Sequence, residues 1–313
     1  MRLPVRAPFH LEATVRVLQR RPTNLIDRWE PPRYRRAIRI RARAVLMEVT
    51  NLATVDAPEL RLSLLGRELP PRAPAEAAPI AREILGLDLD PGTLQRRAGA
   101  EPALREIARE LRGMRPPRYP DLFETVANVI PFQQLSVDAG MAVVAQLVRR
   151  FGEVGVHDGQ PFHLFPTAET IADVRAASLK RCGMSASKSE ALRSVAKAIA
   201  SGVLTADSFT KLSSAEAIER LTQLSGIGPW SAALILLRGL RRLDVFPQTD
   251  RGAENSLAAL LHLRSRASLI RFVERFGEYR GYLYFYGLAS RLLAAGLIHP
   301  AVGLQSVTAP ARA

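Results

Sequence analysis

Cysteine and lysine are scarce in this sequence of 313 residues, and long hydrophobic runs are missing. The one cysteine, Cys182, excludes an intramolecular disulfide, a thiolate-rich zinc or iron–sulfur site and a cysteine-based alkyl-transfer domain. The longest purely aliphatic run of the C-terminal half, Ala232–Leu237, is far too short to span a bilayer. Arg2 and Arg6 are not followed by a continuous apolar segment, so we expect neither a signal peptide nor a membrane partner.

Positive charge is the strongest feature of the composition. There are 44 Lys and Arg against 30 Asp and Glu, which gives a net charge of +14 and a pI near 10.9. Only positions 180, 188, 197 and 211 are lysine, and the other cations are arginine. Because arginine binds phosphate through paired hydrogen bonds, this favours a polyanionic partner such as nucleic acid. The alternative is a genome that raises arginine in all its proteins.

Residues 1–88 alternate apolar and polar side chains, which is typical of antiparallel strands with one face in water. The alternating segments are Leu11–Gln19, Arg35–Met47 and Glu59–Leu65. The composition of Pro70–Pro79 predicts a linker, and Ile80–Leu85 predicts a short helix. These patterns indicate a small α+β domain.

Residues 89–299 repeat apolar side chains at helical spacing, which predicts an all-helical domain with short connections. The predicted helices include Pro102–Leu111, Ser136–Phe151 and Tyr282–Leu293. The sequence of residues 300–313 predicts a flexible tail. The fold class is therefore mainly α, with an N-terminal α+β domain.

The segment Leu221–Ala232 predicts two helices joined by a tight hairpin. The first helix ends near Leu224, Gly226-Ile-Gly228 forms the turn, and Pro229 suits the first turn of the next helix. Glycines leave backbone N–H groups open to a phosphate, and the second helix adds its N-terminal dipole. Such a hairpin binds a DNA backbone without reading base sequence, although a lone Gly-x-Gly also occurs at ordinary helix corners.

A second motif, Asp244–Asp250, follows the hairpin. Thr249 can cap the next helix, which places Asp250 in its first turn. The helix dipole stabilises a carboxylate there as the anion, and this suits a group that acts beside a developing cation. Taken alone, an acid in a first turn is more often merely a helix-stabilising residue.

The two motifs together, Leu224-Ser-Gly-Ile-Gly-Pro-Trp-Ser-Ala232 and Asp244-Val-Phe-Pro-Gln-Thr-Asp250, resemble the helix–hairpin–helix/Gly-Pro-Asp (HhH-GPD) superfamily of base-excision DNA glycosylases, and in particular its AlkA-like 3-methyladenine DNA glycosylase II branch. The resemblance extends over residues 5–298. Further matching segments are Arg115–Val126, Phe132–Val137, Phe165–Ala168 and Ala186–Ala191. It implies a TATA-box-binding-protein-like antiparallel sheet domain (1–88), followed by an all-helical HhH-GPD domain (89–299).

The resemblance also implies roles for single residues. Asp250 falls on the catalytic aspartate, and Trp230 falls where lyase branches carry a Schiff-base lysine, although an indole cannot form an imine. The implied base pocket consists of Trp230, Phe132, Tyr279 and Tyr282, and the implied wedge that fills the gap in the duplex is Gln134 or Leu135. For Tyr279, Tyr282 and Leu135, ordinary packing is an equal alternative. The implied DNA-binding residues are Ser225, Gly226, Ile227, Gly228, Pro229 and Thr249.

No cofactor is expected beyond a monovalent cation, Na⁺ or K⁺. Backbone carbonyls of Thr222, Leu224 and Ile227 match those that hold such an ion in the family. The sequence departs from the family at two positions. Phe132 stands where glycine is usual, and Thr249 stands where an acidic residue often precedes the catalytic aspartate.

The function implied is that of a monofunctional DNA glycosylase that initiates base excision repair. It would flip cationic N3- or N7-alkylated purines out of double-stranded DNA and hydrolyse the N-glycosidic bond without lyase activity. Its partner would be damaged duplex DNA, and it would act as a monomer in the cytoplasm, at the nucleoid. Two alternatives stay open: a non-catalytic HhH protein that binds DNA structures, and a glycosylase of the same fold for a neutral deaminated or oxidised base.

Overall fold

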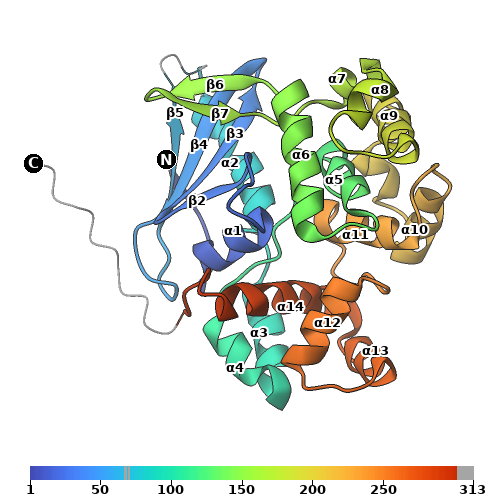
Figure 1. The fold of residues 1–313 in the computed structure, drawn as a ribbon. Helices are drawn as coiled ribbons and strands as arrows, with labels where there is room; N and C mark the ends of the chain where they lie inside the picture. Colours follow the sequence, from blue (N-terminus) through green and yellow to red (C-terminus); the bar gives the residue numbers. More distant parts are fainter. Residues whose placement is uncertain (67–68, 70, 302–313) are drawn as a thin grey trace, which may run out of the picture.

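The computed structural model describes residues 1–66, 69 and 71–301 (Figure 1). Its N-terminal part is built on a five-stranded antiparallel sheet in the order β1-β5-β4-β3-β2. The strands are β1 (Arg2–Leu3), β2 (Arg28–Glu30), β3 (Arg33–Ile40), β4 (Arg43–Asn51) and β5 (Leu60–Leu65). The alternation at Arg35–Met47 therefore covers two strands, and they are joined at Arg41 and Ala42 in left-handed backbone conformation.

Helix α1 (Leu11–Gln19) occupies a segment whose alternation predicts a strand, and that prediction is wrong. His10 caps the helix, because its Nδ1 accepts the N–H of Ala13 at 3.3 Å. Its apolar side chains enter two cores, the sheet core with Leu11, Val15 and Leu18 and the helical core with Ala13 and Val17. Apolar residues on two faces of a helix produce a pattern that resembles alternation. Helix α1 therefore lies between the two cores and connects them.

Helix α2 (Ala73–Leu85) lies where composition predicts a linker. Ala73, Ala77 and Ala81 are fully buried and repeat every four residues, which is the spacing of one helix face. They belong to the core beneath the sheet. Pro79 lies inside the helix. The prolines of this segment favoured the prediction of a linker. The alanines nevertheless lie on one face of a helix, and this face packs into the core beneath the sheet.

The rest of the described chain is helical apart from one hairpin. The α-helices are α3 (Pro91–Ala100), α4 (Arg105–Glu110), α5 (Leu122–Ala127), α6 (Val137–Phe151), α7 (Ala168–Asp173), α8 (Ala176–Lys180), α9 (Ala186–Ala200), α10 (Ser214–Thr222), α11 (Pro229–Gly239), α12 (Arg251–Leu260), α13 (Arg266–Glu274) and α14 (Arg280–Ala294). Short 3₁₀ turns are η1 (Pro102–Leu104), η2 (Ile130–Phe132), η3 (Ala206–Phe209) and η4 (Gly277–Tyr279). The predictions for α6 and α14 are confirmed, whereas the helix predicted at Pro102–Leu111 is split into η1 and α4.

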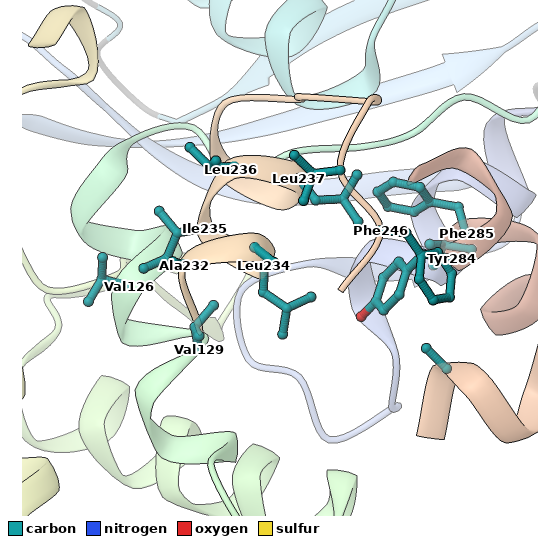
Figure 2. Close-up of a cluster of buried hydrophobic side chains, with 14 of the residues drawn as sticks. Val126, Val129, Ala232, Leu234, Ile235, Leu236, Leu237, Phe246, Tyr284 and Phe285 are labelled. Carbon is teal, nitrogen blue, oxygen red and sulfur yellow. The ribbon is translucent and has the colours of Figure 1, made fainter. Parts of the chain in front are cut away.

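Helix α11 forms the centre of the helical core. All its residues from Ser231 to Gly239 are buried. Figure 2 shows Val126 and Val129 on one side of this helix and Phe246 with Phe285 on the other. The helix that begins at the predicted hairpin is thus held from several sides, which fixes the position of its first turn.

Strands β6 (Val154–His157) and β7 (Gln160–His163) form a two-stranded sheet inside the part predicted to be all-helical. This hairpin lies beside the large sheet (Figure 1), and Phe162 packs with Ala37 and Leu46 of that sheet. The helical periodicity could not predict this hairpin, because it is short and its buried face depends on a partner from the other domain. The mainly helical fold with an N-terminal sheet domain is nevertheless confirmed.

A buried ion cluster joins the sheet to the helices. Arg36 of β3 donates to Asp27 at 2.7 Å and to the carboxylate of Glu124 on α5. These side chains are at most 4% exposed. Burial, together with the nearby carboxylates of Asp121 and Asp27, raises the pKa of Glu124 to about 8 against the opposing effect of Arg36.

Within residues 1–66, 69 and 71–301, no helix is both long enough and apolar enough to cross a bilayer. The tail predicted at 300–313 lies outside the described residues from residue 302 onward.

Candidate active site

The predicted hairpin is present between α10 and α11. Helix α10 ends at Thr222, two residues before the predicted end. Gly226 has a φ of +80°, and a Cβ added there would lie 2.4 Å from the Cβ of Ala191 on α9. Gly228 is different, because a Cβ added there would meet no atom within 4 Å. Glycine is therefore required at Gly226 by the fold, whereas at Gly228 it leaves open space next to the first N–H groups of α11.

The carbonyls assigned to a monovalent cation lie in this turn. That of Leu224 accepts the N–H of Ile227 at 3.0 Å, and Thr222 is the last residue of α10. Backbone carbonyls are the donors that alkali ions accept in place of water, so the turn suits such an ion chemically. Among the described residues, no group of three or more His, Cys, Asp or Glu could hold a metal.

Asp250 lies one position earlier relative to its helix than the sequence suggests. It is itself the N-cap of α12, and its Oδ1 accepts the N–H of Ala253 at 2.9 Å. Thr249, predicted as the cap, has a left-handed φ of 70° and donates its N–H to Glu254. The left-handed residue turns the chain so that the next side chain, and not its own, reaches the free N–H groups of the helix.

Trp230 and Asp250, one from each of the two motifs, contact each other. The indole Nε1 of Trp230, on the first turn of α11, donates to Oδ2 of Asp250 at 3.2 Å. Both oxygens of the carboxylate thus accept an N–H, and it lies at the positive end of the α12 dipole. These contacts hold the carboxylate as an oriented anion.

A cavity of about 470 Å³ opens beside Asp250. Trp230 and Phe132 line it, as expected, together with Tyr284 of α14 and Arg20 at the end of α1. Tyr279 and Tyr282 do not line it. Tyr282 is buried and donates its hydroxyl to the carbonyl of Met114, and Tyr279 packs against the helical core.

The sequence analysis placed the wrong face of α14 in the base pocket. The cavity is lined by Tyr284, Leu288, Arg291, Leu292 and Ala295, which share one face of that helix at helical spacing. Helical spacing counted back from Leu292 and Leu288 could have identified Tyr284. Arg20 had no such signal, because it belongs to the other domain.

A second, open cavity of about 920 Å³ adjoins the first. The two share Phe132, Leu135, Trp230, Asp250 and Gly252. The open cavity continues past Lys188 to Gly228 and Pro229 of the hairpin, and Thr249 also lines it. We call it the groove. It connects Gly228, Pro229 and Thr249, three of the six residues assigned to DNA binding, with Asp250 and Trp230.

The two wedge candidates lie where the groove meets the cavity. Leu135 is 42% exposed and lines both spaces, and Gln134 has a left-handed φ of 57° and lines the groove. Sequence analysis missed Gln133, whose amide donates to the carbonyl of Gly226 at 2.7 Å and to Oγ of Ser231 at 2.9 Å. Lys188 also donates to carbonyls of this loop, and burial lowers its pKa. These contacts fix the loop of Leu135 against the hairpin.

The comparisons with known proteins agree with this geometry. The chain matches the HhH-GPD superfamily base excision DNA repair protein model over residues 127–275 and the AlkA N-terminal domain model over residues 1–121. It is 30% identical over 207 residues to the DNA-3-methyladenine glycosylase of Bacillus subtilis, which covers 65% of this chain and 68% of the relative.

Two solved structures are similar as well. The 3-methyladenine DNA-glycosylase from Archaeoglobus fulgidus has a TM-score of 0.76 and 26% identity, covering 94% of this chain and 99% of that one. The 3-methyladenine DNA glycosylase of Schizosaccharomyces pombe, in complex with abasic DNA, has a TM-score of 0.53 and 27% identity, covering 64% and 97%.

Proposed function

Because the chain belongs to the AlkA-like DNA-3-methyladenine glycosylases of the HhH-GPD superfamily, which act in base excision repair of alkylated bases, we propose that it works on double-stranded DNA as a monofunctional hydrolase with Asp250 as its catalytic carboxylate. One observation carries the assignment: Asp250 lies where the groove joins the cavity, with both carboxylate oxygens oriented by N–H donors.

The chemistry follows from that position. Breaking an N-glycosidic bond develops positive charge on the sugar, and a fixed anion beside the sugar stabilises it. A purine alkylated at N3 or N7 is already cationic and leaves without a strong general acid. The cavity beside Asp250 has the size of a small-molecule site and receives the flipped base, with Trp230 and Phe132 as aromatic walls. Asp250 then stabilises the sugar cation or orients the attacking water.

The groove supplies the DNA contacts of this proposal. The first N–H groups of α11 receive a phosphate at Gly228, and Leu135 enters the space that the flipped nucleotide leaves. The relative solved with abasic DNA supports DNA as the partner. The carbonyls of Thr222, Leu224 and Ile227 would hold a monovalent cation near that phosphate. We propose a monomer, because cavity and groove are lined by one chain.

The residue at position 230 determines whether the DNA strand is cleaved after the base has been released. An indole nitrogen cannot form an imine with the sugar, so the abasic site is left intact. The position of Asp250 disfavours a non-catalytic DNA-binding protein, because a helix cap without catalytic function has no need to face a cavity.

The test is the release of free base from methylated duplex DNA. We expect free methylpurines, abasic sites that break only after alkali treatment, and no strand breaks before it. Strand breaks without alkali would contradict the monofunctional assignment. Absence of released base at any enzyme concentration would contradict the proposed activity.

Two glycine-to-alanine variants of the hairpin distinguish its role in DNA binding from its role in folding. Gly228→Ala adds a methyl group to open space, so we expect unchanged thermal stability but weaker binding to duplex DNA, by about tenfold or ~1.4 kcal/mol. Gly226→Ala forces a methyl group against Ala191 at a positive φ, so we expect loss of stability. Fluorescence anisotropy and thermal melting measure the two effects. Wild-type affinity in Gly228→Ala would place the phosphate elsewhere.

A further inference from the structure

Helices α12 and α13 lie side by side (Figure 1), and a space of about 720 Å³ opens between them, which we call the hollow. Its α12 wall consists of residues that share one face of the helix, Arg251, Glu254, Asn255 and Ala258. The cavity beside Asp250 is lined by the opposite face, with Ala253 and Ser256. Helix α12 therefore separates the two spaces, and the chemistry proposed at Asp250 does not use the hollow.

The hollow continues the groove. Thr249 and Arg251 line both spaces, so the two meet at the start of α12. The groove leads from Gly228 of the hairpin past Asp250 to this junction. A DNA strand that follows the groove in that direction therefore reaches the hollow after it has passed the catalytic carboxylate.

The one acidic residue among the described residues that line the hollow is Glu254, and its charge is already balanced. Its carboxylate accepts hydrogen bonds from Nε and Nη2 of Arg266 at 3.1 and 3.0 Å, and from the N–H of Thr249 at 3.0 Å. The hydrogen bond from Arg266 holds the pKa of Glu254 below its ordinary value. The pair of Glu254 and Arg266 thus adds no net charge to the wall.

Arg251 and Arg264 leave the hollow positively charged. Both are exposed, and neither has a carboxylate within salt-bridge distance in the part of the chain that the structure describes. Helix α13 begins after Ser265, which also lines the hollow, and the positive end of its dipole adds to the same potential. A polar space with two uncompensated arginines, at the end of a DNA-binding groove, suits the phosphates of that DNA.

We propose that the hollow extends the DNA-binding groove beyond Asp250, and that Arg251 and Arg264 bind backbone phosphates there. The DNA is then held on both sides of the flipped nucleotide, by the hairpin on one side and by the hollow on the other. Such contacts position the duplex without reading its base sequence. The inference rests on the proposed function, because it extends the path of the same DNA.

The experiment measures affinity and its salt dependence by fluorescence anisotropy, on a duplex that carries a tetrahydrofuran abasic-site analogue. Arg264 is the residue to change, because Arg251 adjoins the catalytic carboxylate. In Arg264→Met we expect roughly five- to tenfold weaker binding at about 0.1 M salt, and a slope of log affinity against log salt concentration that is smaller by about 0.9, the share of one phosphate. Arg264→Lys retains the charge and should keep the wild-type slope. Arg271→Met is the matched control, because it removes the same charge from α13 but lines neither the hollow nor the groove.

The length of the duplex gives a second readout. Two shortened duplexes lack the base pairs on one side or on the other side of the analogue. We expect one of them, and only that one, to remove the difference between wild type and Arg264→Met, because its phosphates no longer reach the hollow.

An unchanged slope in Arg264→Met would overturn the inference. An equal decrease in Arg271→Met would overturn it too, because the effect would then come from net charge alone, and so would a difference that persists on both shortened duplexes. Base release from methylated DNA by the wild-type protein is measured in parallel. Release together with an unchanged slope in Arg264→Met would leave the proposed function intact, whereas absence of release would contradict the proposed function whichever slope is found.

Discussion

Base release is expected to fall by about 10²- to 10³-fold in Asp250→Asn, which corresponds to roughly 2.7–4 kcal/mol of lost transition-state stabilisation. The amide carries no charge beside the developing sugar cation. Asparagine is as good an N-cap as aspartate, so α12 keeps its start and the variant keeps its fold. Binding to duplex DNA should persist, because the hairpin is not altered.

Single-turnover release from methylated DNA measures the first effect, and anisotropy measures the second. Glu254→Gln is the matched control, since it neutralises a carboxylate in the first turn of the same helix. Glu254 pairs with Arg266 and does not line the cavity, so release should change by a few-fold at most. Wild-type release in Asp250→Asn would show that another group stabilises the sugar cation.

Arg36→Met is expected to lower the free energy of unfolding by about 3–5 kcal/mol, because it leaves the carboxylate of Asp27 buried without its cation and removes the donor to the carboxyl group of Glu124. Urea unfolding measures the loss. Arg39→Met is the matched control on the same strand, and its ion pair with Glu153 is solvent-exposed. That variant should lose about 1 kcal/mol or less. Equal losses in the two variants would mean that the buried cluster contributes no more than a surface pair.

The same cluster has a consequence for pH. Burial raises the pKa of Glu124 to about 8 in the folded protein, so the folded state holds this proton more tightly than the unfolded state. Glu124 therefore makes the wild-type protein less stable as pH rises from about 5 towards 8. In Glu124→Gln this contribution should be absent, and the slope of stability against pH in that range should become flatter.

The sequence was most informative where a motif is local. The helical spacing over Ser136–Phe151 predicted α6, and the segment Leu221–Ala232 predicted the hairpin before α11. Helix α1 was predicted wrongly because it is buried on two faces. The one-residue shift at Asp250 depends on the left-handed Thr249, which only the folded loop reveals.

The cavity was harder to predict because its walls come from distant parts of the chain. Tyr284 was missed in favour of Tyr282, two residues away, because the sequence does not show which face of α14 the cavity lies on. Arg20 is separated from Asp250 by the whole of the sheet domain and most of the helical domain. No spacing rule relates two such positions, and only the packing of α1 brings them together.

The position of α1 between the two cores has an evolutionary consequence. Because this helix places side chains in both cores and ends at Arg20 in the cavity wall, the sheet domain is not an independent module attached to an enzyme. Recombination that replaced the first domain would also replace part of the base pocket. Substrate range in such a lineage can therefore change by exchange of the domain that holds neither the hairpin nor the catalytic aspartate.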